Sequence, residues 1–337
     1  GQDKLRRASV LVVGAGGLGV PVLQYLAGAG VGHIDIVDAD VLEPSNLHRQ
    51  TWYALADCGR PKAELAAQRV RALNPEVLVH AYAVRLDAAN AADRAHKHDL
   101  ILDCSDNFTT KFLLNDLALE LRKPVLFASV YQYEGQLQLV RGDDASPCLR
   151  CVWPEATRDG LVGNCAEAGV LGPVPGVFGS LQALEALKLL LGLDGLRPDE
   201  MLIFDLVTLH TQRLRARRSA ACEAHQRSGR PAPASAPAAD SLELQFASLV
   251  TAFEAGYTLI DVRDARERDA EPLAVASLHL PMARLLTEVA ALDLERPYLL
   301  VCATGKRSTA AADLLRSQGF RHCRSLRGGV RALKVSA

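Results

Sequence analysis

The feature that most constrains the fold of this chain is a run of glycines between two apolar segments near the N-terminus. The apolar run Val10-Leu11-Val12-Val13 is followed by Gly14, Gly16 and Gly19, and residues 20–29 then show the apolar spacing of a helix. This order predicts a strand, a turn and a helix of a parallel βαβ fold. Glycines in G-x-G-x-x-G spacing let a nucleotide phosphate approach the positive end of the helix. Tight strand–helix packing without a ligand, or a nicotinamide-dependent dehydrogenase, would use the same spacing.

Strands and helices alternate along the rest of the chain. Further strands are expected at residues 33–37, 100–102, 124–128, 201–206, 258–262 and 298–301, and helices at 63–72, 110–121, 177–191 and 308–318. Such alternation predicts parallel strands with helices on both faces of the sheet. The fold class is therefore α/β, with a Rossmann-like first domain whose sheet is mostly parallel.

One stretch lacks this pattern. Residues 219–240 read SAACEAHQRSGRPAPASAPAAD, and few of their side chains could bury enough apolar area to offset the entropy of ordering. A chain of 337 residues is also longer than the roughly 100–200 residues of one domain. We predict a first domain over residues 1–225, a flexible Ala/Pro linker over 226–240, and a small α/β domain over 241–337.

Composition and charge give no reason to expect binding to nucleic acids or membranes. The formal net charge is −1, from 38 Lys and Arg against 39 Asp and Glu, which favours neither nucleic-acid nor anionic-membrane binding. We expect no apolar run of the roughly 20 residues that a membrane span needs, and the first residues show no signal-peptide pattern. We therefore predict a cytoplasmic protein, whose eight cysteines indicate metal binding or thiol chemistry rather than disulfides.

Polar residues follow several predicted strands at their carboxyl ends. Asp38 ends the second strand, where a ribose-binding carboxylate would lie. Arg49 and Lys62 could bind a polyphosphate, and Asp40 and Asp106 offer the hard oxygen ligands of Mg²⁺. Each residue alone could be a surface charge or a helix cap. Together they favour a nucleoside triphosphate with Mg²⁺ over a nicotinamide.

The segments GAGGLG, VDADxxxxSNLHRQ, GRPK and DCSDN resemble the motifs of the MoeB/ThiF adenylating enzymes, bacterial relatives of the ubiquitin-activating enzymes, over residues 4–225. The resemblance implies that ATP adenylates the C-terminal glycine of a ubiquitin-like sulfur carrier ending in Gly-Gly, such as MoaD or ThiS. The carrier carboxylate would attack the α-phosphorus and pyrophosphate would leave, with positioning and charge neutralisation supplying most of the catalysis. The resemblance also implies a homodimer.

By motif match, Asp38 would hold the ribose, Asn46, Arg49 and Lys62 the phosphates, and Asp40 with Asp106 the Mg²⁺. The full nucleotide-binding set implied is Gly14, Gly16, Gly17, Gly19, Asp38, Asp40, Asn46, Arg49, Lys62, Asp106 and Asn107. Family members usually carry an arginine before the first strand that reaches the partner subunit's ATP site. Arg6 and Arg7 do not match its motif, so a non-catalytic scaffold that only docks the carrier is an alternative.

Two cysteine pairs suggest a zinc site. Cys148-Leu149-Arg150-Cys151 is a Cys-x-x-Cys, and Cys222-Glu223-Ala224-His225 is a Cys-x-x-His. Cys148, Cys151, Cys222 and His225 could close a tetrahedral Cys₃His site. The resembled family has four cysteines here, so His225 is a substitution that keeps a zinc ligand. A redox dithiol at 148 and 151, or no metal at all, are the alternatives.

The second domain carries a cysteine loop between a strand and a helix. In Cys302-Ala303-Thr304-Gly305-Lys306-Arg307 the loop N–H groups would surround the sulfur, and the helix N-terminus, Lys306 and Arg307 would favour an anion there. A buried structural cysteine is the alternative. This loop, Asp261-Val262-Arg263 and Arg327-Gly328-Gly329 resemble a single-domain rhodanese over residues 242–334, which implies a persulfide on Cys302. A phosphatase of related fold typically has a loop one residue longer.

The two resemblances together imply one reaction sequence. The Cys302 persulfide, loaded by a cysteine desulfurase or thiosulfate, would attack the acyl-adenylate, and reductive cleavage would leave a thiocarboxylate on the carrier. Cys165, in a glycine-bearing loop, matches a family cysteine and is either the second thiol or a dispensable one. An adenylation-only enzyme with an idle rhodanese domain remains an alternative. The carrier could serve molybdopterin, thiamin, cysteine or siderophore synthesis.

Overall fold

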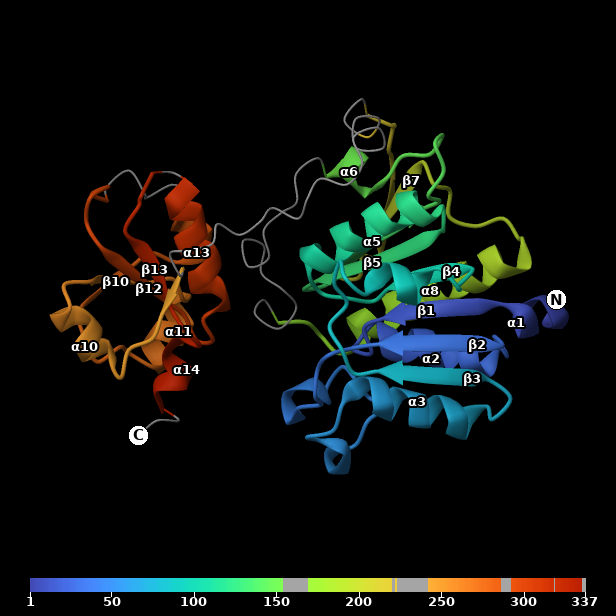
Figure 1. The fold of residues 1–337 in the computed structure, drawn as a ribbon, viewed down its shortest axis with the longest axis horizontal. Coiled ribbons are helices and arrows are strands. Elements are labelled where there is room, and N and C mark those ends of the chain that lie inside the picture. The colour runs from blue at the N-terminus through green and yellow to red at the C-terminus, as the bar shows by residue number, and fades with distance from the viewer. Residues whose placement is uncertain (154–168, 220–221, 223–241, 286–291, 318, 335–337) are drawn as a thin grey trace. The chain divides into compact units, whose positions relative to one another are not determined.

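The computed structural model describes residues 1–153, 169–219, 222, 242–285, 292–317 and 319–334, which form two compact units (Figure 1). The N-terminal unit contains the described residues up to 222, and the C-terminal unit contains those from 242 onward. Each unit is described by itself.

The N-terminal unit is built on one eight-stranded sheet with the order β3-β2-β1-β4-β5-β6-β7-β8. Its strands are β1 (Ser9–Val13), β2 (His33–Val37), β3 (Leu78–Tyr82), β4 (Leu100–Asp103), β5 (Val125–Tyr131), β6 (Glu134–Val140), β7 (Glu200–Asp205) and β8 (His210–Arg215). The pairs from β3 through β5 are parallel, and β6, β7 and β8 add antiparallel strands. The sheet is mostly parallel, as predicted.

Helices cover both faces of this sheet (Figure 1). They are α1 (Gln2–Arg7), α2 (Gly19–Gly28), α3 (Lys62–Leu73), α4 (Ala91–Ala95), α5 (Phe108–Leu121), α6 (Leu149–Val152) and α8 (Pro173–Leu191), with short 3₁₀ turns η1 (Pro44–Asn46) and η2 (Leu55–Asp57). Val10 and Val12 face a core shared with α2, α3 and α8, whereas Leu11 and Val13 face one shared with α4 and α5. Because both faces are covered, β1 is apolar throughout rather than alternating.

Helix α8 is long and apolar enough to cross a membrane by length and composition alone. No run of that length was expected from the sequence. Phe178, Ala183 and Ala186 of α8 are fully buried in the core, and the helix packs against α2, β5 and β6. The core of the N-terminal unit therefore accounts for the buried face of α8.

The C-terminal unit contains a five-stranded parallel sheet with the order β11-β10-β12-β13-β9. Its elements are β9 (Glu243–Leu244), α10 (Leu249–Glu254), β10 (Thr258–Asp261), α11 (Ala265–Ala270), β11 (Ser277–His279), η3 (Met282–Arg284), β12 (Tyr298–Val301), α13 (Lys306–Ser317), β13 (Cys323–Leu326) and α14 (Gly329–Lys334). Strand β12 has the predicted bounds. Helix α13 begins at Lys306, two residues before the expected start, so the cysteine loop is shorter than the sequence suggested.

Candidate functional site

The glycine loop joins β1 to α2 at the carboxyl end of the sheet. Gly14 has a φ of +101°, and a Cβ there would lie 2.7 Å from the Cys104 carbonyl oxygen. A Cβ on Gly19 would collide with the Gly14 carbonyl oxygen. The Tyr53 hydroxyl donates a hydrogen bond of 2.9 Å to the Ala15 carbonyl of this loop. Gly14 and Gly19 therefore lie where a side chain would collide with the backbone. The first turn of α2 follows this loop at the carboxyl end of β1.

Asp38 is fixed against this loop by two backbone donors. Its Oδ2 accepts a hydrogen bond from the Ala15 N–H at 2.7 Å, and its Oδ1 accepts one from the Asp40 N–H at 2.8 Å. Burial raises the pKa of the Asp38 carboxyl above its ordinary value, although these hydrogen bonds oppose that effect. The carboxyl therefore has a set orientation at the end of β2, where a ribose hydroxyl binds in such folds.

Lys62 and Asp40 come together beside Asp38. The Lys62 ammonium pairs with Asp40 Oδ2 at 2.9 Å; the lysine side chain is 7% exposed and the aspartate 72%. An antiparallel bridge between Val41 and Pro61 holds the two segments side by side. A buried lysine that reaches an open carboxylate can meet a phosphate or a metal-bound phosphate from the solvent side.

Asn46 and Arg49 lie in the turn around η1. Asn46 is buried, and its Oδ1 accepts a hydrogen bond from the Glu43 N–H at 3.2 Å. Arg49 is half-buried and donates to the Ser45 carbonyl at 3.3 Å. Gln50, for which the sequence suggested no role, is buried with an Oε1 that has no hydrogen-bond partner among the described residues. Its Nε2 would be 3.5 Å from a Cβ on Gly16, so this orphaned amide adjoins the glycine loop and fits a bound nucleotide.

Asp106 and Asn107 follow β4. Asp106 is exposed, and Asn107 caps α5 by accepting a hydrogen bond from the Thr110 N–H at 2.8 Å. Since β2 and β4 flank β1 in the sheet, the segments after these strands lie at the same edge as the glycine loop. The structure thus brings the segments that carry the predicted nucleotide-binding residues to one edge of the sheet, with Asp40 after β2 and Asp106 after β4.

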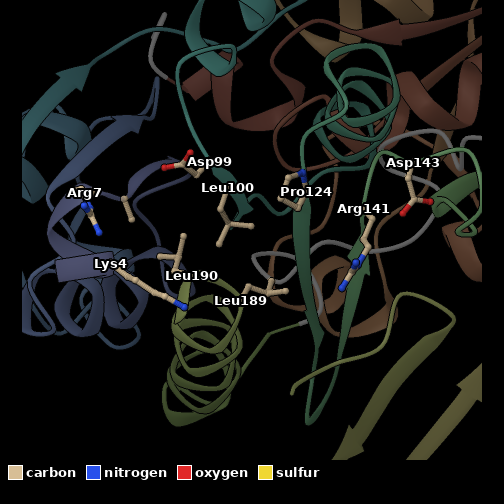
Figure 2. A pocket seen from close by; sticks show the side chains of 10 residues that line it. Lys4, Arg7, Asp99, Leu100, Pro124, Arg141, Asp143, Leu189 and Leu190 are labelled. Atoms are coloured by element: carbon tan, nitrogen blue, oxygen red, sulfur yellow. The ribbon is translucent and has the colours of Figure 1, made fainter. Parts of the chain in front are cut away.

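A hollow of about 650 Å³ lies elsewhere (Figure 2). Lys4, Arg7, Asp99, Pro124 and Arg141 are among its lining residues. Asp99 and Pro124 directly precede β4 and β5, so the hollow is at the amino ends of the strands. The predicted nucleotide-binding residues follow the carboxyl ends, and this hollow is not their site.

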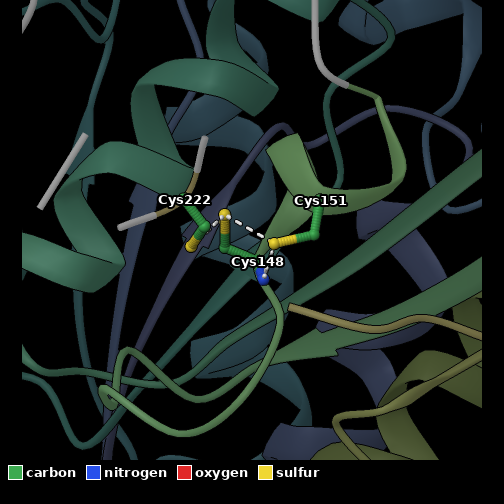
Figure 3. A group of neighbouring side chains, drawn as sticks. All are labelled: Cys148, Cys151 and Cys222. Atoms are coloured by element: carbon green, nitrogen blue, oxygen red, sulfur yellow. Dashed lines mark hydrogen bonds between the residues drawn. The ribbon is translucent and has the colours of Figure 1, made fainter. Parts of the chain in front are cut away.

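Three cysteine sulfurs converge in the N-terminal unit (Figure 3). Cys148 Sγ lies 3.9 Å from Cys151 Sγ and 3.4 Å from Cys222 Sγ. A tetrahedral zinc site with Zn–S bonds of about 2.3 Å places its sulfurs about 3.8 Å apart. The three thiols therefore fit a zinc ion. The fourth predicted ligand, His225, lies outside the described residues.

The loop that carries two of these cysteines is anchored to α5. The Leu149 N–H donates to Asn115 Oδ1 at 2.7 Å, and the Arg150 guanidinium binds both Asp116 oxygens, at 2.9 and 2.8 Å. Burial raises the pKa of the Cys148 thiol. Cys151 is also partly buried, but hydrogen bonds from Ser219 and Cys148 outweigh that effect and lower its pKa. The pair thus has one thiol already biased toward the thiolate that binds metal.

The Cys302 sulfur of the C-terminal unit lies inside a cradle of donors. The Gly305 N–H donates to Sγ at 3.1 Å, and the Ser308 N–H and hydroxyl both lie 3.4 Å from it. Cys302 is fully buried. A Cβ on Gly329 would collide with the Cys302 carbonyl oxygen, so the Arg327-Gly328-Gly329 segment packs directly on this loop. The cradle suits a sulfur anion held by backbone donors.

Arg307, predicted to favour an anion at the cysteine loop, forms an ion pair with α11. Its guanidinium pairs with both oxygens of Glu267, at 2.7 and 2.6 Å, and this hydrogen bonding lowers the pKa of Glu267. Arg263 and Asp261 form a second, buried pair with contacts of 2.9 and 2.7 Å. Gly305 and Ser308 thus supply donors to Sγ, and both arginines form ion pairs with acidic residues of the surrounding segments. Cys165 and the Lys306 side chain lie outside the described residues.

Comparisons with known proteins identify the family of each unit. The ThiF family model matches residues 1–224, and the rhodanese-like domain model matches residues 246–335. The "Sulfur carrier protein adenylyltransferase" of Thermus thermophilus is 48% identical, over 66% of this chain and 83% of its own length. "Adenylyltransferase and sulfurtransferase MOCS3" of Drosophila grimshawi is 36% identical, over 98% of this chain and 80% of its own.

The fold also matches a solved structure. Escherichia coli MccB with ATP has a TM-score of 0.57 at 20% identity, and the match covers 66% of this chain and 68% of that one. At this identity the likeness shows the fold alone. The matches confirm the two family resemblances drawn from the motifs. The chain belongs to the ThiF family and carries a rhodanese-like domain after its ThiF domain.

Proposed function

We propose that this chain is an adenylyltransferase and sulfurtransferase that acts on a ubiquitin-like sulfur-carrier protein ending in Gly-Gly. The observation that carries the proposal is that both sites occur on one chain, and that a relative named for both activities aligns with 98% of it. ATP is the proposed nucleotide. The proposal includes a homodimer, as the family resemblance implies, and a cytoplasmic location, as the sequence composition predicts.

In the adenylation step the carrier's C-terminal carboxylate attacks the α-phosphorus of ATP and pyrophosphate leaves. Asp38 orients the ribose, and Lys62, Arg49 and Asn46 bind the phosphates. Mg²⁺, when bound by Asp40 and Asp106, neutralises phosphate charge. Attack on phosphorus depends mainly on positioning and charge stabilisation. Fixed groups around the glycine loop can supply both.

In the sulfur step Cys302 first becomes a persulfide. Its thiolate attacks the outer sulfur of thiosulfate and sulfite leaves, or it receives the sulfur from a cysteine desulfurase persulfide, whose thiolate leaves. The terminal persulfide sulfur then attacks the acyl-adenylate carbonyl, and AMP leaves with the C–O electron pair. The thiolate of Cys165, or of an external thiol, attacks Cys302 Sγ, which forms a disulfide and releases the carrier thiocarboxylate.

The test uses the full chain with ATP, Mg²⁺, thiosulfate and a carrier ending in Gly-Gly. We expect carrier-dependent ATP–pyrophosphate exchange and, with an added thiol reductant, a carrier mass increase of about 16 units as sulfur replaces oxygen. Cys302→Ala should keep the exchange and lose the mass shift. Absence of exchange with any carrier would support the docking scaffold, and exchange without a mass shift in the unaltered chain would support the adenylation-only enzyme.

A further inference from the structure

Two histidines and one aspartate meet at the amino end of β2. His33 Nε2 lies 2.8 Å from Asp35 Oδ1, and His80 Nδ1 lies 2.9 Å from the same oxygen. The two ring nitrogens are 3.1 Å apart. The pairing of β2 with β3 accounts for this arrangement, because Asp35 and His80 are direct partners in the parallel register and His33 lies on the same face two residues earlier.

The three atoms form a triangle of the size that a metal site needs. A tetrahedral ion with bonds of about 2.0–2.1 Å holds its nitrogen and oxygen ligands about 3.3 Å apart. The observed triangle is only a few tenths of an ångström smaller, so small rotamer shifts would open it. A proton can link only two of the three atoms at once, whereas a central cation would bind the lone pairs of all three.

Neighbouring groups orient these three side chains as outer partners do in metal sites. His33 Nδ1 lies 3.3 Å from the Ser9 hydroxyl, which turns Nε2 toward Asp35. His98 is almost fully buried, and its Nε2 lies 3.4 Å from Asp35 Oδ2, the oxygen that does not face the other two rings. Neither nitrogen of His98 makes a hydrogen bond within the described part of the chain. The buried His98 imidazole beside Oδ2 would hold Asp35 in place when Oδ1 binds an ion.

We propose that His33 Nε2, Asp35 Oδ1 and His80 Nδ1 form a binding site for a divalent transition-metal ion such as Zn²⁺. Two imidazoles and one carboxylate suit Zn²⁺, whereas Mg²⁺ and Ca²⁺ prefer oxygen ligands throughout. The His80 side chain is 47% exposed and that of His33 27%, so water or another small ligand can reach a fourth position.

This site is separate from the other proposed sites of the N-terminal unit. His33 begins β2 and Asp38 follows its end, so the length of the strand, about 16 Å at a rise of roughly 3.3 Å per residue, lies between them. The cysteine cluster uses none of the same residues. The ion would tie the edge strand β3 to β2 without contacting the nucleotide-binding groups.

The experiment titrates Zn²⁺ into the full chain, with the cysteine cluster first occupied, and counts bound zinc by elemental analysis and calorimetry. We expect one further equivalent in the unaltered protein. His80→Asn should weaken this second event at least about tenfold, because even the loss of an outer partner commonly weakens metal sites by 10–100-fold. His96→Asn is the matched control, since His96 is exposed and lies outside the cluster, and it should bind as the unaltered chain does.

Two further measurements keep the result interpretable. Metal-free His80→Asn should still unfold in a cooperative thermal transition with only a small loss of Tm from the missing Asp35 contact, because His80 is half-exposed on an edge strand. Cys148→Ser should lose the cluster's zinc and retain the second event. No zinc beyond that of the cysteine cluster, or equal affinity in the unaltered chain and His80→Asn, would overturn the proposal, and carrier-dependent exchange would be unaffected in either case.

Discussion

Alanine differs from glycine by one methylene group. Within α2, the effect of adding this group on ATP binding and on stability depends on the position of the glycine. A Cβ on Gly19 would collide with the Gly14 carbonyl oxygen, whereas a Cβ on Gly28 meets no atom within 4 Å. We expect Gly19→Ala to displace the glycine loop and sharply weaken ATP binding. Gly28→Ala should leave ATP binding unchanged and raise the free energy of unfolding by up to about 1 kcal/mol, because alanine loses less backbone entropy in a helix.

The measurement compares ATP titrations and urea unfolding of the two variants. Tryptophan fluorescence reports the N-terminal unit, since Trp52 and Trp153 both lie there. Equal ATP affinity in Gly19→Ala and Gly28→Ala would contradict a close-packed nucleotide loop.

The carboxyl of Glu267 should make the C-terminal unit sensitive to acid. Hydrogen bonding to Arg307 holds the pKa of Glu267 below its ordinary value of 4.5. A lowered carboxyl pKa stabilises the folded state above the unfolded pKa, and this contribution is lost as pH falls through the folded pKa. Glu267→Gln should therefore be less stable than the unaltered chain at pH 7, and the difference should shrink below about pH 4.5.

Hydrogen–deuterium exchange of peptides from α11 and α13 measures that difference locally. Asp269→Asn is a suitable control, because Asp269 is exposed and its ion pair is with the neighbouring Arg268. A stability difference between Glu267→Gln and the unaltered chain that stays constant from pH 7 to pH 3.5 would argue against the Arg307 pair as its cause.

Among the elements, α8 adds hydrogen bonds from a buried polar side chain to its apolar packing on the sheet. Gln182 is fully buried and donates to the Asp103 and Leu126 carbonyls, at 2.9 and 2.8 Å. Gln182→Ala would remove both buried hydrogen bonds, which costs about 1–3 kcal/mol in total. Leu184→Ala, at a position that is 51% exposed, should cost within about 0.5 kcal/mol. Urea unfolding measures the free energy of unfolding of both variants. Equal losses would contradict a stabilising role of the Gln182 hydrogen bonds.

The elements also show how far the sequence could predict this fold. Strand β12 was predicted with its exact bounds because it is an uninterrupted apolar run. Strand β8 was not predicted, because all its residues are exposed and carry no apolar pattern that distinguishes a strand from a loop. Helix α8 begins at Pro173, four residues before the predicted start, because proline is tolerated in the first turn of a helix and its glycine neighbours conceal the boundary.

Some site residues could be predicted from the sequence and others could not. Ordered motifs located the residues around the glycine loop, since each motif follows a strand that ends at one edge of the sheet. Tyr53 contacts that loop and Gln182 contacts β4 and β5. Both contacts join residues far apart in the sequence, and no local pattern marks them. The histidine cluster depends on the pairing of Asp35 with His80, which is known only once the register of β2 and β3 is known.

For the molecule as a whole, loss of zinc should affect one unit and spare the other. Cys148→Ser removes a ligand from the cysteine cluster, and the loop bearing Cys148 anchors to α5. We expect the Tm of the N-terminal unit to fall, by roughly 2–4 °C for each kcal/mol lost. Persulfide formation on Cys302 from thiosulfate should persist, because the described contacts of Cys302 lie within the C-terminal unit. A parallel loss of persulfide formation would contradict independent units.

The strand order of the N-terminal unit has a consequence for synthesis on the ribosome. β1 pairs with β4. Gln182 of α8 donates hydrogen bonds to one carbonyl of β4 and one of β5. At roughly 5–20 residues per second, on the order of 10–40 s pass between the appearance of β1 and that of α8. A nascent chain that ends just before Pro173 would contain every nucleotide-binding motif without the helix that secures them. Cotranslational ATP binding is therefore expected to begin only when α8 has left the exit tunnel.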